Sequence, residues 1–506
     1  MTTTPSPDLT DSLRNRRAPL DLPPDQFRAF GHQLVDQIAD FLASLPSRKV
    51  TPGEPVQAVR ELIDFNRSLP EQGCEPGPLL GWIAEQLFDH SLHNGHPRFW
   101  GYVTSSAAPI GALADLLAAA VNPNAGGWKL SPLASEIEVQ TIRWIAQLIG
   151  YPADCGGLLV SGGNMANFVG FLVGRRKTSG WDVRKEGMAA GGKSLRIYTS
   201  QETHTWIQKA ADLFGLGTDA IAWVPSDSDQ RMGTSQLRAM IEDDRRRGYQ
   251  PLMIVGTAGS VSTGAVDPLD ELADIAAEND LWFHIDGAYG AFAAALPDAS
   301  ADLRALNRAD SVAMDPHKWL YAPLEAGCVL VRKRELLLET FSYHPPYYHF
   351  DPELTNYFDL GPQNSRGFRA LKVWLALQQV GREGYVRMIS DDIRLAGELY
   401  RILPDYPDLE RLTHGLSIVT FRYLPPDLRS RRGTPEVGEY LDDLNREILD
   451  RLEASGEAFL SNAVVNGRFA LRLCIVNFRT SLEDIEALPP LVIRLGEEAD
   501  RARRTS

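Results

Sequence analysis

The sequence has few cysteines, no long apolar run and no excess of basic residues, and each absence excludes a class of protein. Its four cysteines are widely scattered, a spacing that fits neither a disulfide framework nor a zinc site. No apolar stretch approaches the roughly 20 residues of a membrane-spanning helix, and residues 1–20 are polar, unlike a signal peptide. A net charge of -15 argues against nucleic-acid and anionic membrane partners. We therefore expect a cytoplasmic protein that binds neither.

The composition is that of an ordinary globular protein with more than one domain. Hydrophobic residues make up 44% of the 506 residues and charged residues 23%, enough for a large core shared by two or three domains. Residues 1–22 lack periodic apolar positions and are predicted to form a disordered arm. We divide the remainder into an N-terminal helical segment (23–112), a large domain (113–385) and a small α+β domain (386–506).

Apolar residues recur at helical spacing at the start of the ordered chain and predict an amphipathic helix over Asp25–Leu45. Such an early helix has little nearby to pack against. Docking on another domain, docking on another subunit and packing within the chain all remain open.

Between about residues 155 and 335, short apolar runs alternate with helical segments, which is typical of a parallel sheet covered by helices. Ligands of such sheets bind beyond the carboxyl ends of the strands, so the residues that follow each run are candidate site residues. The predicted strands are Gly157–Val160, Leu195–Thr199, Ala220–Val224, Met253–Gly256, Leu281–Ile285, Ser311–Met314 and Cys328–Val331.

Two loops after predicted strands are suited to an anion and a flat ligand. Gly162, Gly163 and Asn164 stand between a strand and an apolar helix, where backbone N–H groups and the helix dipole attract a phosphate. The loop lacks the lysine and hydroxyl of a nucleotide P-loop and the dinucleotide glycine pattern. The second loop, small and hydroxyl-rich, begins at Thr257. Plain turns are the alternative for both.

Three charged or titratable residues follow other predicted strands. His204 could stack on a ring or relay a proton, although a structural histidine is the simpler interpretation. Asp286 ends a buried-strand pattern, where a carboxylate needs a cation, a donor or a helix cap. Lys318 follows 32 residues later between His317 and Trp319; it is either a surface lysine or a desolvated amine that forms a Schiff base. A phosphate loop, a stacking ring, a carboxylate and a lysine are what pyridoxal phosphate needs.

The chain resembles the group II pyridoxal-phosphate-dependent amino-acid decarboxylases, whose aromatic-amino-acid branch has the Pro-His-Lys-Trp motif found at residues 316–319. The resemblance covers most of the chain and implies the α/β fold of the aspartate aminotransferase superfamily (fold type I), with a mainly parallel seven-stranded sheet and a homodimer that shares its active sites. It also includes the segments 96–99, 131–132, 161–167, 204–210, 286–289 and 369–374.

The resemblance implies a role for each matched residue. Lys318 would form the imine with the cofactor aldehyde, and Asp286 would contact the pyridine nitrogen. His204 and Ala288 would pack on the two faces of the ring, and Thr257 would lie near its oxygen. The phosphate would be bound by Gly163 and Asn164, with help from Asp315 and His317.

Two further features concern substrate and product. Phe99, Trp100, Tyr102 and Ser105 resemble the pocket wall of aromatic decarboxylases, which implies tryptophan, tyrosine, phenylalanine or DOPA as substrate; core packing is the alternative for these aromatics. The segment 341–362 has the length and composition of a closing lid, and Tyr357 matches the tyrosine that protonates the product in the family.

Several alternatives remain at this point. The substrate could be a non-aromatic amino acid such as glutamate or histidine, and an oxidative deamination to an aldehyde could accompany decarboxylation. A transaminase or lyase of the same fold would keep the carboxylate, for which Arg479 is the candidate ligand. A degenerate cofactor-binding protein is the non-enzyme alternative. No metal is expected.

Overall fold

The computed structural model describes residues 7–16, 18–343 and 354–505, which belong to two compact units, 1–93 and 94–506. In the first unit, the predicted amphipathic helix is confirmed, and the ring of Phe41 stacks on Phe88 at 4.6 Å between centroids. The unit contains helices α1 (Pro7–Arg14), α2 (Pro24–Ser44), α3 (Val56–Leu62) and α4 (Pro76–His90).

The predicted disorder of residues 1–22 is wrong for Pro7–Arg14, which form α1. Proline suits the first turn of a helix because its missing N–H would have no partner there, and Arg14 in the last turn complements the helix dipole. Both effects are local, so this short helix does not need the apolar periodicity on which the prediction relied.

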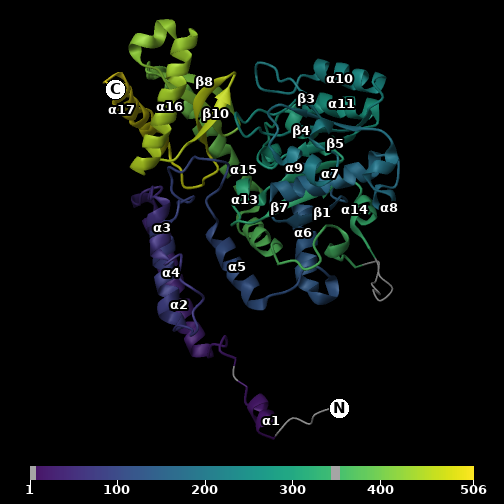
Figure 1. Cartoon of the computed structure of the whole chain (residues 1–506), viewed down its shortest axis with the longest axis vertical. Helices are drawn as coiled ribbons and strands as arrows, with labels where there is room; N and C mark the ends of the chain where they lie inside the picture. Colours follow the sequence, from purple (N-terminus) through teal and green to yellow (C-terminus); the bar gives the residue numbers. More distant parts are fainter. Residues whose placement is uncertain (1–6, 17, 344–353, 506) are drawn as a thin grey trace. The chain divides into compact units, whose positions relative to one another are not determined.

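The second unit contains the predicted seven-stranded sheet, in the order β1-β7-β6-β5-β4-β2-β3 (Figure 1). Six strands run in one direction, and β7 is antiparallel to both of its neighbours. All seven predicted strands are therefore confirmed, as is the mainly parallel sheet. Their bounds are β1 (Gly156–Val160), β2 (Leu195–Ser200), β3 (Ile221–Val224), β4 (Gln250–Thr257), β5 (Trp282–Asp286), β6 (Ser311–Met314) and β7 (Gly327–Val331).

Helices cover both faces of this sheet and bury two separate apolar cores. One face packs against α6 (Pro132–Ile149), α10 (Thr234–Arg246), α11 (Leu269–Asn279) and α15 (Ala370–Ile402). The other packs against α7 (Gly163–Thr178), α9 (Trp206–Leu213) and α14 (Arg334–Phe341). The remaining helices before α15 are α5 (Pro109–Val121), α8 (Val183–Glu186), α12 (Ala301–Arg304) and α13 (Pro316–Trp319).

The register of the central strands places polar residues side by side. Thr257 at the end of β4 pairs with Asp286 at the end of β5, which pairs in turn with Ala313 on β6. Because these strands are parallel, the loops that follow them leave the same edge of the sheet.

A second, antiparallel sheet has the order β10-β11-β9-β8, packed against α16 (Pro435–Ser455) and α17 (Leu482–Thr505). The edge strands β8 and β10 contain exposed and partly exposed residues and lack a continuous apolar run. The strands are β8 (Leu409–Gly415), β9 (Ile418–Tyr423), β10 (Ser461–Val465) and β11 (Arg468–Cys474).

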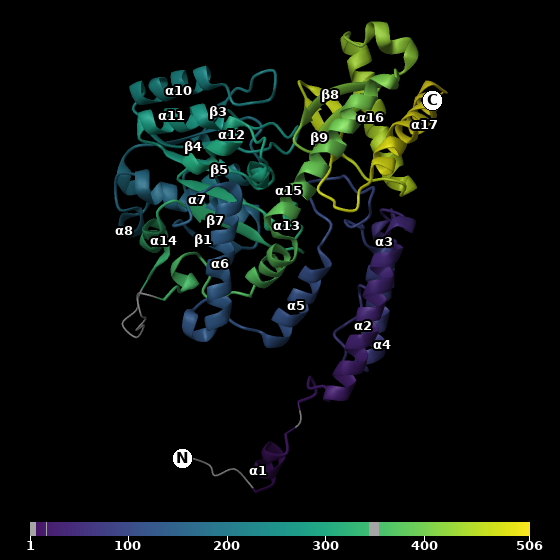
Figure 2. The same ribbon diagram turned by 180° about the vertical axis from the view of Figure 1, so that it is seen from behind.

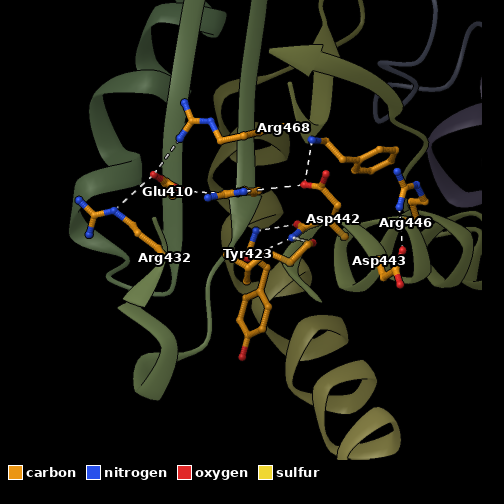
Figure 3. A network of polar contacts seen from close by, with 11 residues as sticks. Glu410, Tyr423, Arg432, Asp442, Asp443, Arg446 and Arg468 are labelled. Carbon is orange, nitrogen blue, oxygen red and sulfur yellow. Dashed lines mark hydrogen bonds and ion pairs between the residues drawn. The ribbon is translucent and has the colours of Figure 1, made fainter. Parts of the chain in front are cut away.

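A buried arginine holds the outer part of this sheet together. Arg422 on β9 is 1% exposed, and its Nε donates to Glu410 Oε2 on β8 at 2.6 Å. Glu410 also pairs with Arg468 at 3.4 Å and with Arg432 at 3.7 Å, while Asp442 lies 3.9 Å from Arg422 (Figure 3). A buried cation is tolerated only with such partners.

The long helix α15 belongs to the cores of both sheets (Figure 2). Its first half packs on the large sheet and its second half on the small one, with a kink at Gly381, whose φ is 66°. The predicted domain boundary at 385/386 therefore falls inside a helix. The boundary predicted at 112/113 likewise falls inside a helix, α5. The two compact units divide after residue 93.

All four cysteines are free thiols, and Cys328 and Cys474 are buried. Among the described residues, no helix combines the length and the apolar character needed to cross a bilayer.

Candidate active site

A cavity of about 510 Å³ opens at the carboxyl ends of the central strands of the large sheet. It collects most of the residues that the sequence predicted as a site, although they come from distant parts of the chain. The predicted residues that line it are Tyr102, Gly163, Asn164, His204, Thr257, Asp286, Ala288, Asp315, His317 and Lys318.

Lys318 reaches the cavity from α13, the short helix that begins directly after β6. Its Nζ donates to Asp315 Oδ2 at 3.1 Å, and its backbone N–H donates to the Asp315 carbonyl at 2.8 Å. The Asp315 side chain is 3% exposed, and its Oδ1 has no hydrogen-bond partner among the described residues. Lys318 is thus an amine held inside a cavity by one carboxylate.

Asp286, the last residue of β5, also faces the cavity and is 6% exposed. The indole Nε1 of Trp206 donates to its Oδ2 at 2.7 Å, and the backbone N–H of Ala288 donates to Oδ1 at 3.1 Å. A carboxylate has about four acceptor positions. These two donors fix its orientation and leave capacity for a ligand cation.

The N-terminus of α7 forms a cradle because Gly162 precedes the helix and Gly163 is its first residue. Gly162 has φ 148°, and a Cβ on Gly163 would lie 2.7 Å from Asp315 Oδ2 and 3.2 Å from the Ala288 Cβ. A side chain at Gly163 would therefore fill the approach to the helix end. The unsatisfied N–H groups of that 16-residue helix are a binding site for an anion.

His204 follows β2, and its Nδ1 accepts a hydrogen bond from the Trp206 backbone N–H at 3.3 Å. Burial lowers the pKa of His204, although Asp286 acts in the opposite direction. The ring is therefore neutral near pH 7 and carries its proton on Nε2. A neutral, partly buried imidazole at the cavity wall is suited to lie against a flat ring.

His317 and Thr257 provide two further polar groups at the cavity. His317 Nδ1 accepts from the Ala326 N–H at 3.1 Å, and burial lowers the pKa of His317. The hydroxyl of Thr257 is buried without a hydrogen-bond partner among the described residues, while its backbone N–H donates to Asp267 Oδ2 at 2.8 Å. An unpartnered buried hydroxyl at a cavity is ready to bind a ligand oxygen.

Three of the residues predicted as pocket wall do not line this cavity. Trp100 is fully buried in the core of the small sheet, where its Nε1 donates to Thr480 Oγ1 at 3.1 Å. Phe99 stacks on Phe459 at 5.4 Å. Ser105 is also buried and donates to the His317 carbonyl at 2.7 Å. Within one chain these three residues do not line the cavity, and their assignment to a substrate pocket stays a prediction.

Tyr357 also lies outside the cavity. It is 1% exposed, packs in the core on the α7 side of the sheet, and has the Arg366 guanidinium 4.6 Å from its ring centroid. It does not line the cavity of its own chain, and its assignment as the proton donor stays a prediction. Residues 344–353 of the predicted lid lie outside the described residues.

The cavity includes residues that the sequence analysis missed. Val103 and Thr104, which follow Tyr102 directly, line the cavity together with it. Burial raises the pKa of Glu202, which stands two residues before His204 and also lines the cavity. Like His204, Glu202 follows the end of β2, and this position could have identified it as a candidate.

Arg472 reaches the same cavity from β11 of the small sheet and is 3% exposed. Its Nη1 donates to Ser461 Oγ and its Nη2 to the Tyr102 carbonyl, both at 2.6 Å. Arg479, the predicted ligand for a retained carboxylate, is not among the lining residues; its guanidinium lies over the Phe478 ring. No local signal distinguishes Arg472 from any other strand residue.

Taken together, one cavity contains an amine, an oriented carboxylate, an anion cradle and a neutral imidazole. These groups fit an aldehyde, a pyridine nitrogen, a phosphate and a ring face, respectively. Lys318 Nζ lies 3.1 Å from Asp315 Oδ2 and offsets the negative charge of this carboxylate beside the cradle.

Comparisons with known proteins agree with this chemistry. Residues 60–424 match the model of the pyridoxal-dependent decarboxylase conserved domain. The chain is 33% identical to an aromatic-L-amino-acid decarboxylase of Bacillus atrophaeus over 485 residues, which cover 95% of this chain and 97% of the relative. A crystal structure of Oryza sativa TDC with PLP and tryptamine has a TM-score of 0.86 and 26% identity, covering 96% and 99% of the two chains. A crystal structure of mouse CSAD has a TM-score of 0.88 and 25% identity, covering 94% of this chain and 99% of that chain.

Proposed function

Because this chain belongs to the pyridoxal-dependent decarboxylase family, we propose that its cavity converts an aromatic L-amino acid to the corresponding amine and carbon dioxide. The observation that carries this proposal is the arrangement of Lys318, Asp286 and the Gly163 cradle around one cavity. The aromatic substrate is supported by the relative from Bacillus atrophaeus, an aromatic-L-amino-acid decarboxylase, and by the structural neighbour that contains tryptamine.

Each part of pyridoxal phosphate has a matching group in the cavity. Gly163 and Asn164 at the N-terminus of α7 would bind the phosphate, and Asp286 would pair with the pyridine nitrogen. Lys318 would bind at the aldehyde, and the Thr257 hydroxyl would donate to the ring oxygen. His204 and Ala288 would pack against the ring. When bound, the cofactor supplies an electron sink for the carbon that loses its carboxylate.

The protein groups orient the reactants and control charge. Asp286, fixed by Trp206 and by the backbone of Ala288, favours the protonated ring nitrogen because its negative charge is close and desolvated. Asp315 holds the Lys318 amine within 3.1 Å, so that the amine remains at the cavity when a substrate displaces it. Among the described residues of the cavity, Lys318 and His204 carry exchangeable protons suited to protonating the product.

A substrate with an acidic side chain is the second candidate, because Arg472 lines the cavity. Both of its Nη atoms already donate to Ser461 and Tyr102, however, and its Nε is buried. Each Nη atom keeps a second N–H, from which an acidic side chain could accept without breaking these hydrogen bonds. The aromatic side chain of Tyr102, 57% exposed at the cavity, favours the aromatic substrate.

We also propose that the enzyme is a cytoplasmic homodimer whose two chains share the active sites. Helix α2 has no buried residue, and its Phe27 is 58% exposed. Helix α5 exposes Leu113, Leu116, Leu117 and Val121, each more than half exposed. Apolar rows of this kind on a highly charged protein favour burial against a second copy. Four free thiols agree with a reducing compartment.

A substrate panel tests the proposed reaction. Purified protein loaded with pyridoxal phosphate is given carboxyl-labelled tryptophan, tyrosine, phenylalanine, DOPA, histidine or glutamate, and labelled carbon dioxide and amine are both measured. The proposal expects equal amounts of the two products from at least one aromatic substrate. Consumption of substrate without carbon dioxide would contradict it, and activity confined to glutamate would establish the second candidate.

A further inference from the structure

Asp392, a buried carboxylate on α15, contacts the turn that carries Lys318. The side chain is 2% exposed, and its Oδ2 accepts two hydrogen bonds, from Trp319 Nε1 at 2.9 Å and from the Tyr321 hydroxyl at 2.7 Å. Both donors lie within three residues of Lys318, on its C-terminal side. Asp392 does not line the cavity, so any effect on the reaction passes through these two side chains.

The same turn is held on its other sides. The Trp319 indole stacks on Tyr289 with a centroid distance of 4.8 Å and an angle of 18°. Tyr289 lines the cavity, and its hydroxyl is 2.6 Å from Ser417 Oγ. The hydroxyl of Tyr385 on α15 donates to the Leu320 carbonyl at 3.1 Å. The Trp319 ring is therefore fixed on one face by Tyr289 and at its N–H edge by Asp392.

This arrangement connects the lysine to both sheets. Helix α15 enters the core of the small sheet a few residues after Asp392, and the backbone of Asn477 also hydrogen-bonds to the Asp392 carboxyl. A shift of α15 or of the small sheet would therefore move Trp319 and, through the backbone, Lys318. Small displacements of a reacting group can change a rate by about 100-fold.

We propose that Asp392 is a positioning residue of this enzyme, which fixes Lys318 in the cavity by accepting hydrogen bonds from Trp319 and Tyr321. The inference deepens the proposed function and relies on Lys318 as the residue that reacts with the cofactor. It assigns the placement of that amine to Asp392, which lies 73 positions after Trp319 in the chain.

The hydrogen bonds from Trp319 and Tyr321 to Asp392 depend on pH near neutrality. Burial raises the pKa of Asp392 to about 7, while the hydrogen bonds from Tyr321 and Trp319 oppose that rise. The titratable groups that face Asp392 are Tyr321, Tyr289 and Cys474, with Asp391 beside it on α15. The ionised form binds the two donors more strongly, since charged acceptors make stronger hydrogen bonds. The turn is thus held most firmly above neutral pH.

Asp392→Asn is the first test, because asparagine keeps the shape and one acceptor oxygen but has no charge to lose. The dissociation constant for pyridoxal phosphate is measured on apoprotein between pH 5.5 and 8.5, together with kcat and KM of the loaded enzyme. We expect kcat to fall about tenfold with little change in KM. In the wild type, the plot of the cofactor dissociation constant against pH should show a break near pH 7, where Asp392 titrates; this break should be absent from the variant. Asp450→Asn, an exposed change on α16, should behave as the wild type does.

Trp319→Phe and Tyr321→Phe serve as a second pair of variants in case Asp392→Asn does not fold. Each variant removes one hydrogen-bond donor to Asp392 and keeps an aromatic ring at its position. Because these donors favour the carboxylate, their loss should move the break in the cofactor dissociation constant to higher pH. A folded Asp392→Asn variant with the wild-type pH dependence, or two phenylalanine variants with an unmoved break, would overturn the proposal. The dissociation constants do not depend on turnover, so they test Asp392 even if no carbon dioxide is released.

Discussion

The indole N–H of Trp206 lies 2.7 Å from Asp286 Oδ2 and is the only side-chain donor to that carboxylate among the described residues. Replacing Trp206 with phenylalanine keeps an aromatic ring, although a smaller one, and removes the donor. A hydrogen bond to a charged group contributes roughly 1.5–3 kcal/mol, so Trp206→Phe should weaken the binding of pyridoxal phosphate by at least tenfold. Quenching of protein fluorescence by the added cofactor measures this.

Trp181→Phe is the matched control, because its indole N–H donates to the Gly187 carbonyl in an exposed loop. It should leave the cofactor affinity unchanged. Equal affinities for both variants would show that Asp286 is oriented without Trp206.

Tyr357→Phe is expected to leave the product unchanged. The ring is buried against Arg366 and does not line the cavity of its own chain, so we expect that its hydroxyl does not protonate the product there. Mass analysis should find amine as the main product, with a kcat within about twofold of the wild type, as for a change remote from the reacting atoms. A switch to aldehyde would restore Tyr357 as the donor.

The ion pair between Arg422 and Glu410 should contribute strongly to stability. Glu410→Gln leaves the guanidinium, 1% exposed, without its carboxylate partner at 2.6 Å. Breaking a buried pair in this way costs about 3 kcal/mol or more, which urea denaturation can measure. Asp443→Asn is the control, because its pair with Arg446 is exposed (Figure 3) and should contribute less than about 1 kcal/mol. Equal losses in the free energy of unfolding for Glu410→Gln and Asp443→Asn would contradict this account of the network.

His284 should make the protein less stable in mild acid. It is fully buried between Ser311 Oγ and Asn167 Oδ1, each at 2.8 Å, and burial lowers the pKa of His284 to about 4. Because the unfolded chain binds the proton near pH 6.5 and the folded chain does not, stability is lost as the pH falls from 6.5 towards 4.

The expected size of this loss follows from the two pKa values. Between pH 7 and pH 5 the wild type should lose about 2 kcal/mol more free energy of unfolding than His284→Asn. His32→Asn, an exposed change on α2, should keep the full wild-type slope. A His284→Asn variant with the same slope would show that the imidazole is protonated in the folded chain.

The large sheet could be predicted from the sequence because its strands are continuous apolar runs, and the residues after those runs are the ones that line the cavity. The edge strands β8 and β10 could not, since half of each is exposed. The aromatic segment 99–102 gave no sign of its partners, because Phe99 stacks on Phe459 and Trp100 packs in the core of the small sheet, far along the chain.

Contacts between distant segments account for the other differences. Trp206, Asp392 and Arg472 lie in ordinary helical or strand patterns, and only the tertiary structure brings them to Asp286, Trp319 and Tyr102. Tyr357 was predicted from a short match in an aromatic-rich segment, in which the pattern of residues does not distinguish a buried ring from a catalytic one.

The role of Lys318 is the central claim, and one measurement tests it most directly. The protein is loaded with pyridoxal phosphate, reduced with borohydride, digested and analysed by mass spectrometry. We expect the pyridoxyl group on the peptide that contains Lys318, and no labelling of that peptide in Lys318→Ala. Attachment to another lysine of the wild type, such as Lys209 or Lys372, would contradict the account.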